Sequence, residues 1–250
     1  AAEMGRQQGQ ACIVNHWIPD GAKDQPMDRI GPRIRLKEAL EEIFAEKICP
    51  ELCLDALECK LFGLGSEDYV VGSHEFYLAY AISHPQLLCL DMGHFHPTET
   101  IHDKLSAIML YKDEILLHVS RGLRWDSDHV VLFNEDLRLL FQEIVRCELL
   151  SRVHLALDFF DASINRVGAW VIGSRATQKA LLASLLEPRL LLRGFEESGD
   201  GAMKLALLEE LRLYPLGAVW NKYCLDQKVP AAAAWIDQLV DYDRQIARKR

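Results

Sequence analysis

The sequence predicts an α/β protein of the parallel (β/α)8 type, a TIM-type barrel, in a single domain over residues 1–250. Short apolar runs alternate with segments of helical spacing about five times along the chain. The chain has 250 residues, 50% of them hydrophobic, which suits the size and the buried core of such a barrel. Three successive apolar runs also end in residues that bind metals, at the strand ends where β/α barrels carry their sites.

Five apolar runs have the length and the flanking residues of strands that are buried on both faces. They are residues 11–17, 56–63, 87–91, 115–120 and 153–159. Because a standard barrel of this type has eight strands, five do not close it. We therefore expect either further strands that the pattern does not reveal or a chain that starts part of the way around the barrel.

Helical spacing follows the first run in residues 33–47, where Leu36, Leu40 and Ile43 recur on one face. The next helices are expected at residues 74–83, from residue 97 onward and at residues 136–149. Beyond residue 163 the chain has helical character, over residues 164–184, 202–214, 219–224 and 235–248. The sequence thus predicts βα units over about residues 1–162 and a helical C-terminal part over about residues 163–250.

The composition argues against several classes of partner. The net charge is -9, so the chain has no general attraction for nucleic acid or for an anionic membrane. The longest apolar run, residues 180–192, is interrupted by Glu187, Pro188 and Arg189, so we expect no membrane span. The seven cysteines form no CxxC pair, which predicts reduced thiols and, without a signal-like segment, a cytoplasmic protein.

Metal-binding side chains end three successive predicted strands. Asp91, His118 and Asp158 lie at or near the C-terminal ends of the runs at residues 87–91, 115–120 and 153–159. Neighbouring parallel strands lie roughly 5 Å apart, so these side chains can meet around one divalent ion. Glu75, from the segment before the third run, is expected to add a fourth oxygen. A single Asp after a strand is more often a turn residue or a helix cap, but the joint pattern favours a metal site.

A second group of possible ligands lies in the loops that follow these strands. His94 follows Asp91, and Asp126 and Asp128 follow the fourth run with Asp-x-Asp spacing. This arrangement suits a second ion, with Asp91 between the two. Carboxylates with one or two imidazoles fit Mn²⁺, Mg²⁺, Co²⁺ or Zn²⁺ and argue against a structural zinc held by cysteines alone. Two such ions can clamp a sugar and polarise its carbonyl. Trp17, after the first run, is either a core residue or part of a sugar-facing edge.

Long motifs in the chain closely resemble those of the L-rhamnose isomerase family. The stretches are LCLDMGHFHPTE, LLHVSRGLRWDSDHVV and LDFFDASINRVGAWVIGSR, with NHWIPDGAKDQPMDR and CKLFGLGSEDYVVGSHEFYLAYA in the N-terminal half. The resemblance runs through essentially all of the chain. It covers only the C-terminal portion of the family's chain, roughly three-fifths, in keeping with five strands out of eight. It implies a barrel of the xylose-isomerase-like kind that interconverts L-rhamnose and L-rhamnulose with Mn²⁺, as a homotetramer.

The resemblance also assigns roles to individual residues. It implies a structural metal site of Glu75, Asp91, His118 and Asp158, and a catalytic Mn²⁺ site of His94, Asp126 and Asp128. Sugar contacts are expected from Trp17, Glu75, His118 and Asp158. The implied reaction is a metal-assisted hydride shift between C2 and C1 of the open-chain sugar. The chain departs from the family pattern at Met92 and Gly122, neither of which is an expected ligand.

Two other interpretations remain open from the sequence. One is a catalytically incomplete barrel that needs a companion chain, because an open parallel sheet exposes unpaired strand edges. The other is a different two-metal barrel enzyme, an epimerase or hydrolase that acts on small sugars. No Gly-rich phosphate loop is present in the sequence, which favours a neutral sugar as the substrate in either case.

Overall fold

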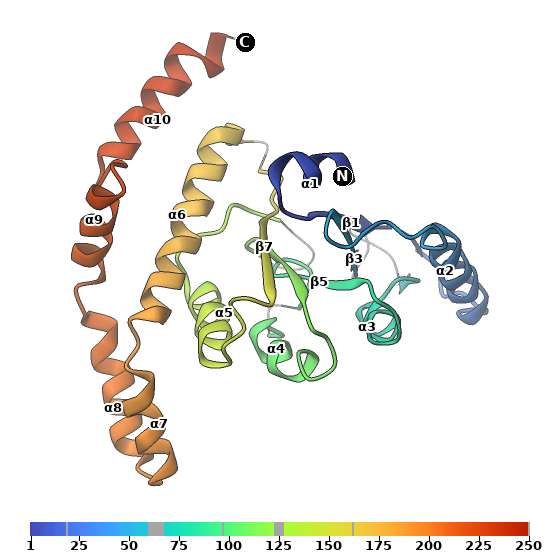
Figure 1. The fold of residues 1–250 in the computed structure, drawn as a ribbon, viewed down its shortest axis with the longest axis horizontal. Coiled ribbons are helices and arrows are strands. Elements are labelled where there is room, and N and C mark those ends of the chain that lie inside the picture. Colours follow the sequence, from blue (N-terminus) through green and yellow to red (C-terminus); the bar gives the residue numbers. More distant parts are fainter. Residues whose placement is uncertain (19, 60–67, 97, 123–127, 162, 250) are drawn as a thin grey trace. The chain divides into compact units, whose positions relative to one another are not determined.

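The computed structural model describes residues 1–18, 20–59, 68–96, 98–122, 128–161 and 163–249. The chain divides into two compact units. The first, which we call the strand unit, comprises Ala1–Val131 and Leu149–Phe160. The second, the helical unit, comprises Leu132–Glu148 and Asp161–Arg250. Figure 1 shows the elements of both units along the chain.

The strand unit contains a five-stranded parallel sheet. Its strands are β1 (Cys12–Trp17), β3 (Cys53–Glu58), β5 (Leu87–Asp91), β6 (Ile115–Val119) and β7 (Val153–Leu157). Their order in the sheet, β1-β3-β5-β6-β7, follows their order in the sequence. A doubly wound sheet reverses its order at a switch point, whereas a barrel does not. The predicted α/β class is confirmed, with a sheet that matches a part of a β/α barrel.

The remaining elements of the strand unit include two pieces of structure that the sequence pattern did not indicate. A short helix, α1 (Ala2–Gln8), precedes β1 and ends at Gly9, whose φ of 69° requires a left-handed conformation. A two-stranded antiparallel sheet pairs β2 (Gly21–Ala22) with β4 (Tyr69–Val70). Both are too short or too polar to leave a periodic signal.

Three predicted helices are present in the strand unit. They are α2 (Ile30–Ile43), α3 (His74–Ser83) and α4 (His102–Ile108). Figure 1 shows them along one side of the sheet, with α3 in contact with β3 and β5. Helix α3 has the predicted bounds, and α2 starts and ends earlier than predicted.

One face of the sheet carries both the apolar core and the polar side chains at the strand ends. Side chains alternate between the two faces of a strand, so Leu87, Cys89 and Asp91 point to the same face. Leu87 and Cys89 belong to a buried apolar cluster with Ala56 and Leu116. This face therefore changes from an apolar layer to polar side chains toward the C-terminal ends of the strands.

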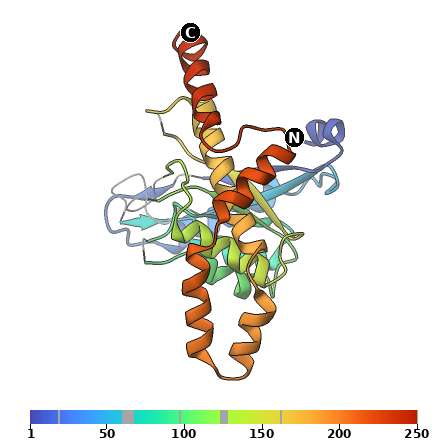
Figure 2. The same cartoon turned by 90° about the vertical axis from the view of Figure 1, so that its left-hand side faces the viewer.

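The helical unit consists of six α-helices and two 3-10 turns among its described residues. They are α5 (Glu135–Arg146), α6 (Arg166–Leu185), α7 (Arg189–Glu197), α8 (Gly201–Glu210), η1 (Leu211–Leu213), α9 (Leu216–Asp226), α10 (Ala234–Gln245) and η2 (Ala247–Lys249). Helix α5 packs along α6, and α7 and α8 form a hairpin that both views show side by side (Figures 1 and 2). Helix α7 was not predicted, and α5 groups with the C-terminal helices rather than with the βα units.

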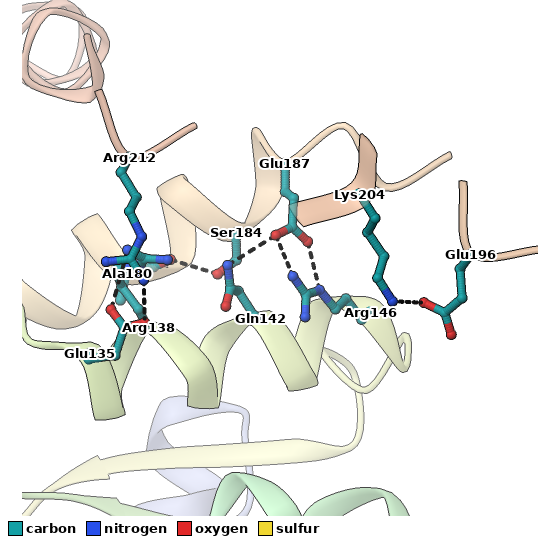
Figure 3. A network of polar contacts seen from close by, with 10 residues as sticks. All are labelled: Glu135, Arg138, Gln142, Arg146, Ala180, Ser184, Glu187, Glu196, Lys204 and Arg212. Carbon is teal, nitrogen blue, oxygen red and sulfur yellow. Dashed lines mark hydrogen bonds and ion pairs between the residues drawn. The ribbon is translucent and has the colours of Figure 1, made fainter. Parts of the chain in front are cut away.

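A polar network around Glu187 connects α5 with the segment between α6 and α7 (Figure 3). Glu187 follows α6, and its side chain is 4% exposed. Arg146 of α5 donates to both of its carboxylate oxygens, at 2.7 and 2.6 Å. Gln142 donates a third hydrogen bond at 3.0 Å. The carboxylate is therefore fully satisfied inside the helical unit.

Among the described helices, none combines the length and the apolar character needed to cross a membrane.

Candidate metal centre

Four strands of the sheet bring a buried polar group together at their C-terminal ends. Its members are Glu58, Asp91, His118 and Asp158, which we call the oxygen-rich group. Glu58 and Asp91 are the last residues of β3 and β5, His118 is next to last in β6, and Asp158 follows β7. One ligand atom from each lies within 4.8 Å of every other. The carboxyl ends of parallel strands meet at one sheet edge, so the fold itself creates this convergence.

The polar atoms of the oxygen-rich group lie close together but cannot all form hydrogen bonds with one another. His118 Nδ1 lies 3.0 Å from Asp158 Oδ2, 3.2 Å from Glu58 Oε1 and 3.4 Å from Asp91 Oδ2. A single imidazole nitrogen can donate at most one good hydrogen bond, so it cannot serve three oxygens. Glu58 Oε1, Asp91 Oδ2 and His118 Nδ1 are buried without a hydrogen-bond partner in the described structure. Groups left this way in a native protein call for another partner.

The opposite oxygen of two of these carboxylates is held by the protein. Asp91 Oδ1 accepts hydrogen bonds from the Gly93 backbone N–H and from the Ser120 hydroxyl, both at 2.6 Å. Glu58 Oε2 accepts a hydrogen bond from the Asn15 side chain. Each carboxylate thus keeps one oxygen fixed and presents the other to the common centre. Supporting hydrogen bonds of this kind orient metal ligands in proteins.

A second group of possible ligands adjoins the first. It consists of Asp91, His94 and Asp128, which we call the loop-side group. His94 is 4% exposed, and its Nε2 lies 3.5 Å from Asp128 Oδ1. The backbone carbonyl of Asp128 accepts from Phe160 at 3.1 Å, which holds the residue beside the end of β7. Because Asp91 belongs to both groups, the two centres would share one carboxylate. Asp126 lies outside the described residues.

The electrostatics of both groups favour a cation. Burial alone lowers the pKa of His118, but the carboxylates around it raise that pKa well above its ordinary value. Burial likewise opposes protonation of His94, yet Asp128 and the neighbouring carboxylates raise its pKa to about 10. Burial is also the main cause of the raised pKa of Asp128. The raised pKa values of the two histidines reflect a concentration of negative charge, which a divalent ion would neutralise.

The donor chemistry fits a divalent metal ion. The oxygen-rich group offers three carboxylates and one imidazole, and the loop-side group offers two carboxylates and one imidazole. Such mixed oxygen and nitrogen sets bind Mn²⁺, Mg²⁺, Co²⁺ or Zn²⁺. The unpartnered atoms of Glu58, Asp91 and His118 point to the position that the ion would take.

The structure places two predicted residues away from these groups or at their margin. Glu75 is the second residue of α3, where its exposed carboxylate accepts from the Ser73 hydroxyl at 2.7 Å. Glu58 stands in the oxygen-rich group where the sequence interpretation had put Glu75. Trp17 ends β1 at the same sheet edge and is 36% exposed.

Glu58 was missed because the strand that carries it was predicted too late in the chain. The apolar residues after Glu58 suggested a strand over residues 56–63, whereas β3 spans Cys53–Glu58 and residues 60–67 lie outside the described residues. With the strand ended at Glu58, the rule that identified Asp91 and Asp158 would have identified it too.

Comparisons with known proteins identify the family of the chain. The sequence profile of L-rhamnose isomerase (RhaA) matches residues 1–250. The L-rhamnose isomerase of Rhodopirellula baltica is 58% identical over 100% of this chain and 58% of its own length. Those of Salmonella newport and Yersinia pseudotuberculosis are 55% and 53% identical, over 100% of this chain and 60% of theirs. The chain therefore spans less than two thirds of the length of these relatives. On the match over its whole length, the chain belongs to the L-rhamnose isomerase family.

Proposed function

We propose that the chain carries the metal centre of an aldose–ketose isomerase that interconverts L-rhamnose and L-rhamnulose. The observation that carries the proposal is the pair of groups at one sheet edge, joined by Asp91, in a chain of the L-rhamnose isomerase family. The relatives named L-rhamnose isomerase supply the substrate class.

The reaction moves one hydrogen and one proton within the sugar and consumes nothing else. Hydrogen passes with its electron pair from C2 to C1, while a proton passes from the oxygen on C2 to the oxygen on C1. Divalent ions, with Mn²⁺ as the expected species, would polarise the sugar oxygens when bound to the two groups. Asp128 Oδ1, with Asp126, is assigned to orient and hold the proton in transit. Trp17 is assigned to contact the apolar face of the sugar from the end of β1.

We further infer that the sheet is part of a complete (β/α)8 barrel. Among the described strands β1 and β7 are edges, so three more strands are needed to close a barrel of eight. We also propose that the chain forms an oligomer, because in the helical unit α8 buries no residue and Leu205 is 65% exposed. The resemblance to the family implies that this oligomer is a homotetramer. A measurement of molar mass in solution by light scattering tests this assembly.

Turnover of L-rhamnose to L-rhamnulose by the 250-residue chain, with Mn²⁺ and then with EDTA, tests the proposed function. We expect metal-dependent formation of the ketose and a loss of roughly a hundredfold or more in Asp128→Asn, with an unchanged circular dichroism spectrum. Full activity in Asp128→Asn would overturn the role of that residue. An epimeric aldose as the product would overturn the isomerase assignment.

Absence of turnover while Mn²⁺ still binds would favour the incomplete-barrel interpretation. The distinguishing experiment adds the segment of the Rhodopirellula baltica relative that this chain does not span. Restored turnover would show that the chain contributes a working metal centre to a barrel of two pieces. No turnover in the joined protein would refute the proposed reaction.

A further inference from the structure

The buried thiol of Cys89 lies directly below the oxygen-rich group. Cys89 is fully buried in β5, two residues before Asp91 and on the same face of the strand. It is paired across the sheet with Glu58 of β3. Cys89 Sγ, a Glu58 oxygen and a His118 nitrogen all lie within 4.8 Å of one another. The thiol thus lies at the boundary between the apolar core and the polar strand ends.

Two of these three residues present buried atoms that have no hydrogen-bond partner. The side chains of Glu58 and His118 are 3% and 8% exposed. Glu58 Oε1 and His118 Nδ1 are unpartnered in the described structure. A carboxylate, an imidazole and a thiol form the type of mixed set that binds zinc, with a fourth position open to water.

We propose that Glu58, Cys89 and His118 form a second, sulfur-containing position for a thiophilic divalent ion such as Zn²⁺ or Cd²⁺. The ion replaces the thiol proton and forms a metal–sulfur bond, because the thiolate is the form that binds metals. The bond has to offset the burial of Cys89, which raises the pKa of its thiol well above the ordinary value. Hard ions such as Mn²⁺ and Mg²⁺ gain little from sulfur and remain at the oxygen-rich group. Glu58 and His118 serve both positions, so the two ions exclude each other. Cys89 therefore makes the centre sensitive to soft metals.

Zinc X-ray absorption spectroscopy tests the coordination directly. The chain is loaded with one equivalent of Zn²⁺ in a background that carries Cys49→Ser and Cys147→Ser, since both of these thiols are exposed. We expect a sulfur neighbour of zinc at about 2.3 Å, which Cys89→Ser removes. Cys53→Ser is the matched control, because Cys53 is a buried thiol of the same sheet outside the group. It should leave the sulfur signal unchanged.

Competition between ions provides a second readout that does not depend on activity. Zn²⁺ is added to the Mn²⁺-loaded chain, and released Mn²⁺ is followed by electron paramagnetic resonance. Zn²⁺ outcompetes Mn²⁺ at most sites, so the informative quantity is the difference between variants. We expect the preference for Zn²⁺ over Mn²⁺ to fall about tenfold or more in Cys89→Ser but not in Cys53→Ser.

The sulfur-containing site shares Glu58 and His118 with the proposed isomerase centre, but the two proposals can fail separately. A zinc shell of nitrogen and oxygen alone, with Mn²⁺ still bound by the unloaded chain, would overturn the sulfur position and leave the isomerase proposal intact. An equal preference for Zn²⁺ in Cys89→Ser and in its background would overturn it as well. Failure of the chain to bind either ion would refute both proposals.

Discussion

The strand unit and the helical unit each bury a carboxylate, and they satisfy it differently. Glu187 in the helical unit is 4% exposed in its side chain and accepts three hydrogen bonds from Arg146 and Gln142 (Figure 3). Glu58 in the strand unit is 3% exposed and is held through one oxygen by Asn15. Its other oxygen has no hydrogen-bond partner among the described residues. Both carboxylates are thus buried, and the unpartnered oxygen is what distinguishes Glu58, as a candidate metal ligand, from Glu187.

This difference has a physical basis in the partners that each element provides. Arg146 matches both oxygens of Glu187 at once, because a guanidinium and a carboxylate form a bidentate pair. The strand ends around Glu58 supply further carboxylates, from Asp91 and Asp158. The cations they offer are the imidazoles of His118 and His94, each 3.2 Å from Glu58 Oε1, which are positive only when protonated. A cluster so rich in negative charge is costly unless a cation joins it. The helical unit has a closed polar network, and the strand unit has an open one.

The largest expected effect comes from breaking the open network at Glu58. Glu58→Gln keeps the shape of the side chain but removes its charge, so the affinity for Mn²⁺ should fall roughly a hundredfold or more. Isothermal titration calorimetry measures the affinity. Glu75→Gln is the matched control, since Glu75 is exposed and lies outside the group, and it should bind Mn²⁺ like the parent chain. The opposite ranking of the two variants would restore the sequence assignment of Glu75.

Breaking the closed network should affect folding but not metal binding. Arg146→Met leaves Glu187 buried with Gln142 as the one remaining donor in the described part of the chain, and the free energy of unfolding should fall by about 2–3 kcal/mol. Urea denaturation measures the change. The double variant Arg146→Met with Glu187→Met should recover most of the loss, because an apolar pair replaces the ion pair. Weaker Mn²⁺ binding in the single variant would show that the two networks are not independent.

Weakening the support of a ligand should produce a smaller change in metal affinity. Ser120→Ala removes one of the two donors to Asp91 Oδ1, and we expect about a tenfold loss of Mn²⁺ affinity. Ser184→Ala is its control in the helical unit, where the hydroxyl only donates to the Ala180 carbonyl. Equal affinities in the two variants would mean that Ser120 does not orient the carboxylate.

The smallest effect is expected at a helix cap in the helical unit. The Asn134 side chain accepts a hydrogen bond from the Leu137 backbone N–H at 3.1 Å at the start of α5. Asn134→Ala should lower the free energy of unfolding by about 1 kcal/mol and leave Mn²⁺ affinity unchanged. A thermal melt with and without the metal checks both parts. No loss of stability would show that water replaces the cap at no cost.

The sequence was most informative where strands are buried on both faces. The runs at residues 87–91 and 115–120 correspond closely to β5 and β6, whose residues are all buried. Because their C-terminal ends are sharply marked, Asp91 and His118 were assigned to strand ends from the sequence alone. The long amphipathic pattern of α5 was also sufficient, since its apolar side chains recur with helical spacing.

The sequence was least informative where local composition and tertiary pairing disagree. Apolar residues after Glu58 moved the predicted strand toward its C-terminal side, whereas pairing of β3 with β1 sets the real bounds at Cys53–Glu58. Helix α7 starts after Pro188 and was obscured by the break at that residue. Which oxygens of Glu58 and Asp91 lack a hydrogen-bond partner depends on residues from other strands. No local sequence pattern could therefore reveal these unpartnered atoms.

A crystal structure of the chain grown with Mn²⁺, with the ion located by its anomalous scattering, tests the central claim most directly. The account predicts an ion about 2.0–2.3 Å from Glu58 Oε1, Asp91 Oδ2, His118 Nδ1 and an Asp158 oxygen. An ion that is bound through Glu75 instead of Glu58, or the absence of any ion at this sheet edge, would contradict it.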